Sequence, residues 1–277
     1  QKNLKLICGI KMLAMELETI FQQLEVKSFL HRGMRMVYRD QVNKQAHELK
    51  HDGGLADFLS AVMERNNDRA VLDAPFYIQG QEGESQVELA LTWTESPKTK
   101  LKSFVNGIPT RDGGTHEQGL KDAIVRALRS FMEAHQLAPK GISLTADDIR
   151  EGTTAIISVL LTDPQFQGQT KDKLNNPGAR SMVESAVRPV FEQWLHDNKS
   201  RGEAIILRAV QAARARVASR QAATAVRRKS ITSTRLNLPG KLSDCSSSDP
   251  QETELFIVEG DSDSVTDSAR PSTLSHR

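Results

Sequence analysis

Apolar side chains recur along the chain with two different spacings, and these spacings predict its helices and strands. Helical spacing of three and four residues occurs over 17–24, 55–63 and 183–195. The clearest helical stripe covers 120–131, where the apolar positions fall at i, i+3, i+4, i+7, i+8 and i+11. A last helix is predicted at 203–228, a segment rich in alanine.

Strand-like patterns fill the regions between these helices. Apolar and polar residues alternate over 34–38 and 87–93, while 75–78 and 103–106 are short segments rich in β-branched and aromatic residues. The unbroken apolar run 155–161 is typical of a strand buried on both faces. The chain is therefore predicted to be a mixed fold of strands and helices.

A polar segment, 163–173, separates the buried strand from a helix expected to begin near Ser181. With about ten residues it is long for a plain connection, and loops of this length are often functional. It contains Gln169, Thr170 and Lys171. On physical grounds alone, a lysine in such a loop is usually a solvated surface charge.

The glycine-rich turn before the 120–131 helix offers a second set of candidates. Thr115 and Gln118 match a capping box, in which the threonine hydroxyl and the glutamine side chain satisfy the first backbone amides. His116 has no nucleophile or second base near it in sequence, so we interpret it as a residue with a structural hydrogen bond.

Two charged clusters have competing interpretations. Asp147 and Asp148 precede Arg150, and a turn with a local ion pair is a better interpretation than a metal site. The 203–228 helix carries six arginines with almost no compensating acid, which makes phosphate contact a serious alternative to a solvated face. These arginines are Arg208, Arg214, Arg216, Arg220, Arg227 and Arg228.

Composition narrows the classes of protein. The 277 residues are enough for about two domains. Cys8 and Cys245 are far apart and no histidines have metal-ligand spacing, which argues against a zinc site or a disulfide framework and fits a reducing cytosol. No apolar run reaches the roughly 18 residues of a membrane span.

Near the C-terminus, the apolar segment 254–258 leads into Glu259, Gly260 and Asp261. Carboxylates that follow a strand and precede a glycine are suitably placed for Mg²⁺, which takes oxygen ligands. By itself this pattern is weak.

Four strings, in this order, resemble the ATPase subunit of bacterial type IIA DNA topoisomerases, namely the gyrase B subunit and its topoisomerase IV counterpart. They are VNGIPTRDGGTHEQGL at 105–120, the segment 144–152, DPQFQGQTKDKL at 163–174, and LPGKLSDC at 238–245 followed by the strand before Glu259. The resemblance covers about 16–262 and does not distinguish gyrase from topoisomerase IV.

The resemblance implies an α+β fold. Residues 1–54 would be the C-terminal remnant of an ATPase domain, 55–228 a transducer domain, and 229–277 a linker with the truncated start of a metal-binding Toprim domain. The implied transducer resembles domain 2 of ribosomal protein S5: a four-stranded sheet backed by helices, with a left-handed crossover, here followed by a long C-terminal helical hairpin.

The resemblance also implies roles for individual residues. Lys171, with Gln169 and Thr170, would contact the γ-phosphate of ATP, and Glu259 would act in DNA cleavage with Mg²⁺. The six arginines would line a cavity that receives the transported DNA segment. The implied partners are DNA, a gyrase A-type subunit and a second copy of the ATPase subunit, in the cytoplasm and without a membrane.

Other interpretations stay open. After Ser262 the chain departs from the family pattern, and the first dozen residues also fit poorly, which a truncated or frame-shifted gene would explain. We expect the isolated chain to be inactive and residues 263–277 not to fold. The alternatives are a non-catalytic nucleic-acid-binding protein with an S5-like fold and the transducer of a mismatch-repair ATPase.

Overall fold

The computed structural model describes residues 14–40, 44–139 and 141–233. The chain divides into two units, 1–220 and 221–277. In the second unit the described residues are the last part of helix α6 (Lys199–Ser233). The sheet and the other described helices belong to the first unit.

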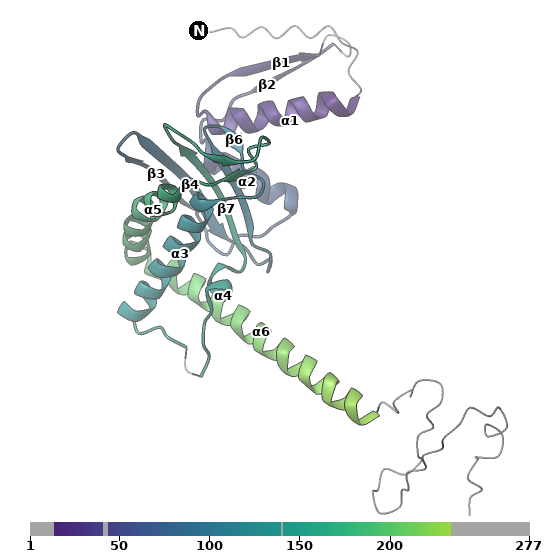
Figure 1. The fold of residues 1–277 in the computed structure, drawn as a ribbon, viewed down its shortest axis with the longest axis vertical. Coiled ribbons are helices and arrows are strands. Elements are labelled where there is room, and N and C mark those ends of the chain that lie inside the picture. The colour runs from purple at the N-terminus through teal and green to yellow at the C-terminus, as the bar shows by residue number, and fades with distance from the viewer. Residues whose placement is uncertain (1–13, 41–43, 140, 234–277) are drawn as a thin grey trace, which may run out of the picture. The chain divides into compact units, whose positions relative to one another are not determined.

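A five-stranded sheet forms the centre of the first unit (Figure 1), with the order β3-β4-β7-β5-β6. Strand β4 is antiparallel to both β3 and β7, and β5 is parallel to β7. The strands are β3 (Phe76–Glu82), β4 (Ser85–Trp93), β5 (Lys100–Val105), β6 (Ile108–Pro109) and β7 (Thr153–Leu160). The four long strands match the predicted ones, and the two-residue β6 is an addition at the edge.

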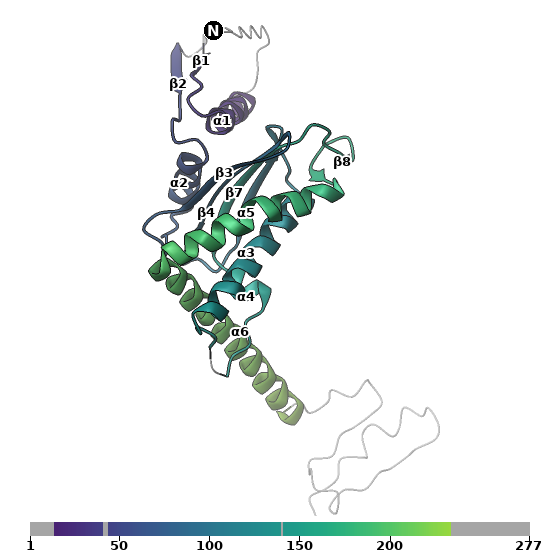
Figure 2. The same ribbon diagram turned by 90° about the vertical axis from the view of Figure 1, so that its left-hand side faces the viewer.

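The sheet lies between two layers of helix, as Figure 2 shows. Side chains of Leu89, Trp93 and Ile157 belong to the core on one face, with α3 (Thr115–Ala134) and α5 (Pro177–Asp197). On the other face, helix α2 (Leu55–Asn66) packs on alternate residues of the same strands, among them Ala90 and Ile156. The central residues of β7, 155–157, are therefore all apolar, because both faces of the strand are covered there.

Helices α3 and α5 run parallel to each other. Near their starts Asp122 of α3 pairs with Arg180 of α5, and further along Arg126 pairs with Glu184. The helices approach closely at Gly119, where an added Cβ would lie 2.3 Å from the carbonyl oxygen of Arg180.

The N-terminal part of the first unit comprises α1 (Ala14–Leu30), β1 (Met36–Asp40) and β2 (Gln45–Leu49). The helix and β1 were predicted, whereas β2 was not. Its sequence, QAHEL, has little strand propensity, and the strand forms by antiparallel pairing with β1, for example between Tyr38 and His47.

Three details of the predicted helices are wrong. Gly114, not Thr115, is the N-cap of α3, and the Thr115 hydroxyl is buried without a hydrogen-bond partner among the described residues. Helix α5 begins at Pro177, before the predicted Ser181, because proline is well accommodated in the first turn. The connector predicted at 198–202 is shorter, since α6 begins at Lys199.

The two last helices do not pack along each other as a hairpin. Helix α5 makes its extensive contacts with α3. From Asn198, α6 leaves in a different direction (Figure 2), and its buried residues, such as Ile205 and Ile206, join the core beneath α3. Gly202 permits this, because an added Cβ there would lie 2.6 Å from the Phe131 ring.

Candidate functional site

The predicted loop at 163–173 is a β-hairpin. Its strands, β8 (Phe166–Gln167) and β9 (Lys173–Leu174), are antiparallel, with Phe166 opposite Leu174. Gln169, Thr170 and Lys171 lie at its tip and are all exposed. Lys171 has a φ of 59°, the left-handed region that a non-glycine residue adopts only under constraint.

The base of this hairpin is hydrogen-bonded to a segment far from it in sequence, the glycine-rich turn at 112–114. The amide of Leu174 donates to the carbonyl of Gly113 at 3.0 Å, and the amide of Asp112 donates to the carbonyl of Asp172 at 2.9 Å. At Gly114 an added Cβ would lie 2.3 Å from the Leu174 carbonyl oxygen, so this backbone approach requires glycine. The hairpin is thus fixed to the chain that enters α3.

The other side of the hairpin base is held by Asn176. Its side-chain oxygen accepts from the amide of Gln165 at 2.6 Å, and its side-chain nitrogen donates to the carbonyl of Asp163 at 2.8 Å. Sequence reasoning missed this anchoring residue, although an asparagine before a proline is a recognised turn signal.

The hairpin tip presents an exposed lysine ammonium. The Lys171 ammonium lies 5.9 Å from the centre of the Phe166 ring and makes no ion pair with a carboxylate of the described residues. The backbone bond between the Asp112 amide and the Asp172 carbonyl brings the exposed Arg111 and Lys173 near the tip, together with the side chains of these two acids. Helices α3 and α5 both begin beside the hairpin, and helix N-termini favour negative charge.

A buried polar network lies under the turn that holds the hairpin. Ser103 donates to Glu117 at 2.7 Å and contacts the Thr110 hydroxyl at 2.6 Å. The Thr110 hydroxyl lies 3.2 Å from His116 Nε2, which is the structural hydrogen bond predicted for this histidine. Burial lowers the pKa of His116 to about 4, so the ring is neutral near pH 7.

Arg208 and Arg216 are held by contacts with other parts of the first unit. Arg216 donates to both carboxylate oxygens of Asp148 at 2.8 Å and to the carbonyl of Ser143 at 3.0 Å. Arg208 forms an ion pair with Glu151 at 3.2 Å, and its side chain is only 12% exposed.

The acid that Arg216 contacts is held in the charged form. Hydrogen bonds from Arg216, followed by those from Thr145, lower the pKa of Asp148 to about 2. Asp148 also completes a capping box with Thr145 at the start of α4 (Ala146–Arg150). The neighbouring Asp147 pairs with Arg150 at 2.5 Å, which confirms the predicted local ion pair.

The remaining candidates differ in what the structure describes. Arg214 and Arg220 have exposed side chains on α6, although Arg220 also takes part in an interaction within the protein. The side chains of Arg227 and Arg228 lie outside the described part of the structure. Glu259 and the Toprim-like segment also lie outside the described residues. Within 14–40, 44–139 and 141–233, no three His, Cys, Asp or Glu residues are grouped to hold a metal. No helix there is long and apolar enough to cross a membrane.

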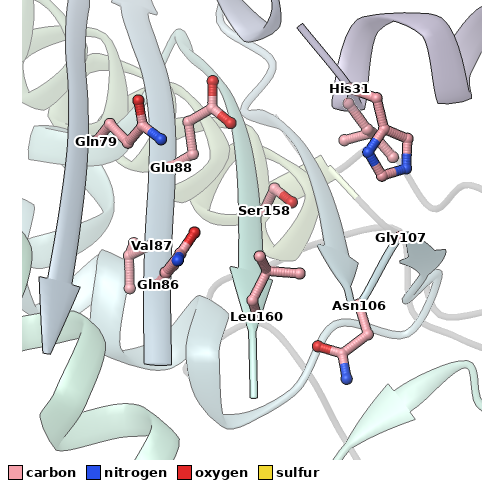
Figure 3. Close-up of a pocket in the computed structure, with 10 residues that line it drawn as sticks. His31, Gln79, Gln86, Val87, Glu88, Asn106, Gly107, Ser158 and Leu160 are labelled. Atoms are coloured by element: carbon pink, nitrogen blue, oxygen red, sulfur yellow. The ribbon is translucent and has the colours of Figure 1, made fainter. Parts of the chain in front are cut away.

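A separate cavity lies beside strands β3, β4 and β7 (Figure 3). It has a volume of about 170 Å³ and is lined by residues that include His31, Gln79, Glu88 and Ser158. None of the residues predicted to bind ATP, Mg²⁺ or DNA lines it. It therefore does not change the assignment of the hairpin as the candidate site.

A protein-family model described as DNA gyrase B matches residues 54–225. The DNA gyrase B protein of Bacillus mycoides is 38% identical over 249 residues, covering 89% of this chain and 61% of that one. Its counterpart from Staphylococcus aureus is 37% identical over 249 residues, covering 88% of this chain and 38% of the relative. The chain thus spans only part of the curated relatives that it matches.

Solved structures are similar over the same region. The 43K ATPase domain of Thermus thermophilus gyrase B, in complex with an aminocoumarin, has a TM-score of 0.70 and 32% identity, covering 78% of this chain and 57% of that one. The topoisomerase IV ATP-binding domain of Francisella tularensis has a TM-score of 0.64 and 30% identity, covering 75% of this chain and 56% of that one. The hairpin and the turn that anchors it both lie inside the residues matched by the family model. The chain belongs to the DNA gyrase B family.

Proposed function

We propose that this chain is the transducer-centred part of a type II DNA topoisomerase subunit, which couples ATP binding and hydrolysis to the passage of one DNA segment through another. The observation that carries the proposal is the hairpin at 166–174, with Lys171 exposed at its tip and its base hydrogen-bonded to the chain that enters α3. A lysine presented in this way suits a phosphate that must be recognised by charge.

Lys171 is the residue that would contact the γ-phosphate of ATP bound by a nucleotide domain, with Gln169 and Thr170 beside it. Its ammonium is accessible, and the beginnings of α3 and α5 add positive potential at the same end. ATP supplies the phosphoryl group whose hydrolysis drives the cycle, and the protein's contribution here is positioned positive charge.

The anchored base gives the hairpin a direct connection to the transducer sheet. A displacement of Lys171 toward a phosphate would pull on Leu174, which is bonded to Gly113 at 3.0 Å. Gly113 lies between the edge strand β6 and helix α3. Nucleotide contact would therefore bias the position of α3 and, through the α3–α5 contacts, that of α5.

We propose that α6 faces the transported DNA. The exposed Arg214 and Arg220, with the predicted Arg227 and Arg228, would contact phosphates, while Arg208 and Arg216 hold α6 to the end of the sheet and to α4. The division into ATPase remnant, S5-like transducer and Toprim start belongs to the same proposal. So do Glu259 as the Mg²⁺ and cleavage residue, a gyrase A-type partner, dimerisation of the gyrase B protein and a cytoplasmic location.

The experiment is a segment exchange. Residues 54–225 of this chain replace the matching segment of the Staphylococcus aureus gyrase B protein, and ATP-dependent supercoiling of a plasmid is measured with a gyrase A protein. We expect strand passage that requires ATP. A folded chimera that hydrolyses ATP and binds the gyrase A protein, yet gives no strand passage, would contradict a coupling role for this segment.

Of the alternatives, the family match favours the topoisomerase over the mismatch-repair transducer. The non-catalytic nucleic-acid-binding alternative makes a different prediction for the chimera. It would bind DNA with unchanged affinity whether or not a nucleotide analogue is present.

A further inference from the structure

Two histidines meet at the ends of the parallel helices α3 and α5. His135 follows the last residue of α3, and His196 lies in the last turn of α5. His135 Nε2 and His196 Nδ1 are 3.2 Å apart, with ring centres separated by 5.2 Å. The phosphate and DNA roles proposed above use neither residue.

The separation of the two nitrogens suits a shared metal ion. Imidazole nitrogens bind Zn²⁺ at about 2.0–2.1 Å, and two such ligands at a tetrahedral angle are about 3.3 Å apart. The observed 3.2 Å is close to this value. Small rotations of the rings would therefore direct one nitrogen lone pair of each ring at one ion, in place of the hydrogen bond that joins the two rings.

The surrounding electrostatics favour a cation. Helix α3 ends here, so its last carbonyl groups and the negative end of its dipole lie at this position, whereas the end of α5 is followed directly by the start of α6 at Lys199. Helix α3 has no lysine or arginine in its last turn to offset this charge. Glu133 and Asp197 are exposed close by in sequence and add further negative charge.

The pair is also held in place before any ion binds. Phe131 is fully buried, and its ring contacts both histidines, with centre separations of 4.4 Å to His135 and 5.6 Å to His196. The two helices are joined along their length by the Arg126–Glu184 ion pair and the close approach at Gly119. A site on two such elements loses little freedom when it binds a ligand.

We propose that His135 and His196 form a binding site for Zn²⁺, with water in the remaining positions. No third His, Cys, Asp or Glu completes a cluster among the described residues, so the protein supplies two ligands and the site is open. Imidazole is a preferred ligand of the later first-row ions and a poor one for Mg²⁺. The ion joins the C-terminal ends of α3 and α5, at the far end of both helices from the Lys171 hairpin.

The test is a titration of the untagged 277-residue chain with ZnCl₂ after treatment with EDTA, followed by calorimetry and by the imidazole signals in NMR. We expect one site whose binding shifts the signals of His135 and His196 and raises the melting temperature. Loss of a partner that only orients a metal ligand costs about 10–100-fold in affinity, so His196→Gln and His135→Gln should each weaken the site at least about tenfold.

The controls separate this site from other zinc binding. His31→Gln, an exposed histidine at the end of α1, should leave the affinity unchanged, and MgCl₂ should shift neither signal. Circular dichroism in EDTA checks that each variant folds. Unchanged Zn²⁺ affinity in a folded His196→Gln variant would overturn the proposal, as would the absence of shifts at both histidines in the original chain.

Discussion

Arg216 of α6 and Asp148 of α4 form a bidentate ion pair in which both hydrogen bonds measure 2.8 Å. Asp148 is 3% exposed, so removal of the arginine leaves a buried carboxylate without its main partner. Because Arg216 itself is partly exposed, we expect Arg216→Ala to lower the free energy of unfolding by about 1–3 kcal/mol in urea denaturation.

Two variants test whether geometry or charge is responsible. Arg216→Lys keeps the charge but cannot donate two parallel hydrogen bonds. It should therefore recover only part of the unfolding free energy that Arg216→Ala loses. Arg214→Ala, an exposed neighbour on the same helix, should change stability by less than about 0.5 kcal/mol. Equal losses at both arginines would show that the Asp148 pair contributes nothing specific.

Two glycines should respond to alanine in opposite directions. At Gly119 the new methyl group would meet the backbone carbonyl of Arg180 at 2.3 Å, so Gly119→Ala should separate α3 from α5 and cost about 1–3 kcal/mol. At Gly178, near the start of α5, an added Cβ would meet no atom within 4 Å beyond its chain neighbours and the backbone of its own helix. Gly178→Ala should therefore stabilise the protein by up to about 1 kcal/mol through helix propensity. Thermal unfolding of the pair measures both; a stabilising Gly119→Ala would refute this packing.

His116 predicts a pH dependence of stability. Its folded pKa, about 4, lies below the usual value of about 6.5, so the unfolded chain binds a proton more readily. The stabilisation is complete above about pH 6.5 and is lost as the pH falls through about 4, with a total near 3 kcal/mol. His116 Nδ1 is buried without a hydrogen-bond partner among the described residues, so no such residue would accept a hydrogen bond from this nitrogen when the ring is doubly protonated. Urea denaturation from pH 7 to 4 should show this slope, and His116→Asn should lack it.

The arginines on α6 predict the salt dependence of DNA binding. If Arg214 and Arg220 each contact a phosphate, replacing both with glutamine should lower the slope of log affinity against log salt by about two. The control is Arg129→Gln on α3, an exposed arginine outside α6, which should leave the slope unchanged. Fluorescence anisotropy of labelled DNA at a series of KCl concentrations gives the slopes. Equal slopes for the parent and both variants would show that the α6 arginines are solvated and do not contact DNA.

The periodic segments of the sequence were sufficient to predict the main elements. The stripe at 120–131 became α3, and the apolar run at 155–161 became β7, because in both cases the spacing specifies which faces are buried. Lys171 was predicted to lie in a polar loop, and it is exposed there, although the length of the loop did not show that the loop is a hairpin.

The parts that failed depend on contacts between distant residues. Thr115 fits a cap by sequence, but the contact between Gly114 and Leu174 fixes the chain so that the helix already begins at Thr115. Arg216 has the same local pattern as Arg214, and its partner is 68 residues away. The unpredicted strand β2 likewise depends on its neighbour rather than on its own residues.

The measurement that tests the central claim most directly compares the ATPase rates of two single variants of the chimeric gyrase B protein, Lys171→Ala and Lys173→Ala. Both lysines are exposed on one hairpin, but only Lys171 is at the tip. Loss of a charge that stabilises the transition state costs about 2–4 kcal/mol, so Lys171→Ala should lower the rate about 10²–10³-fold while Lys173→Ala stays near the parent. A near-normal rate in a folded Lys171→Ala protein would contradict the assignment of this hairpin to the γ-phosphate.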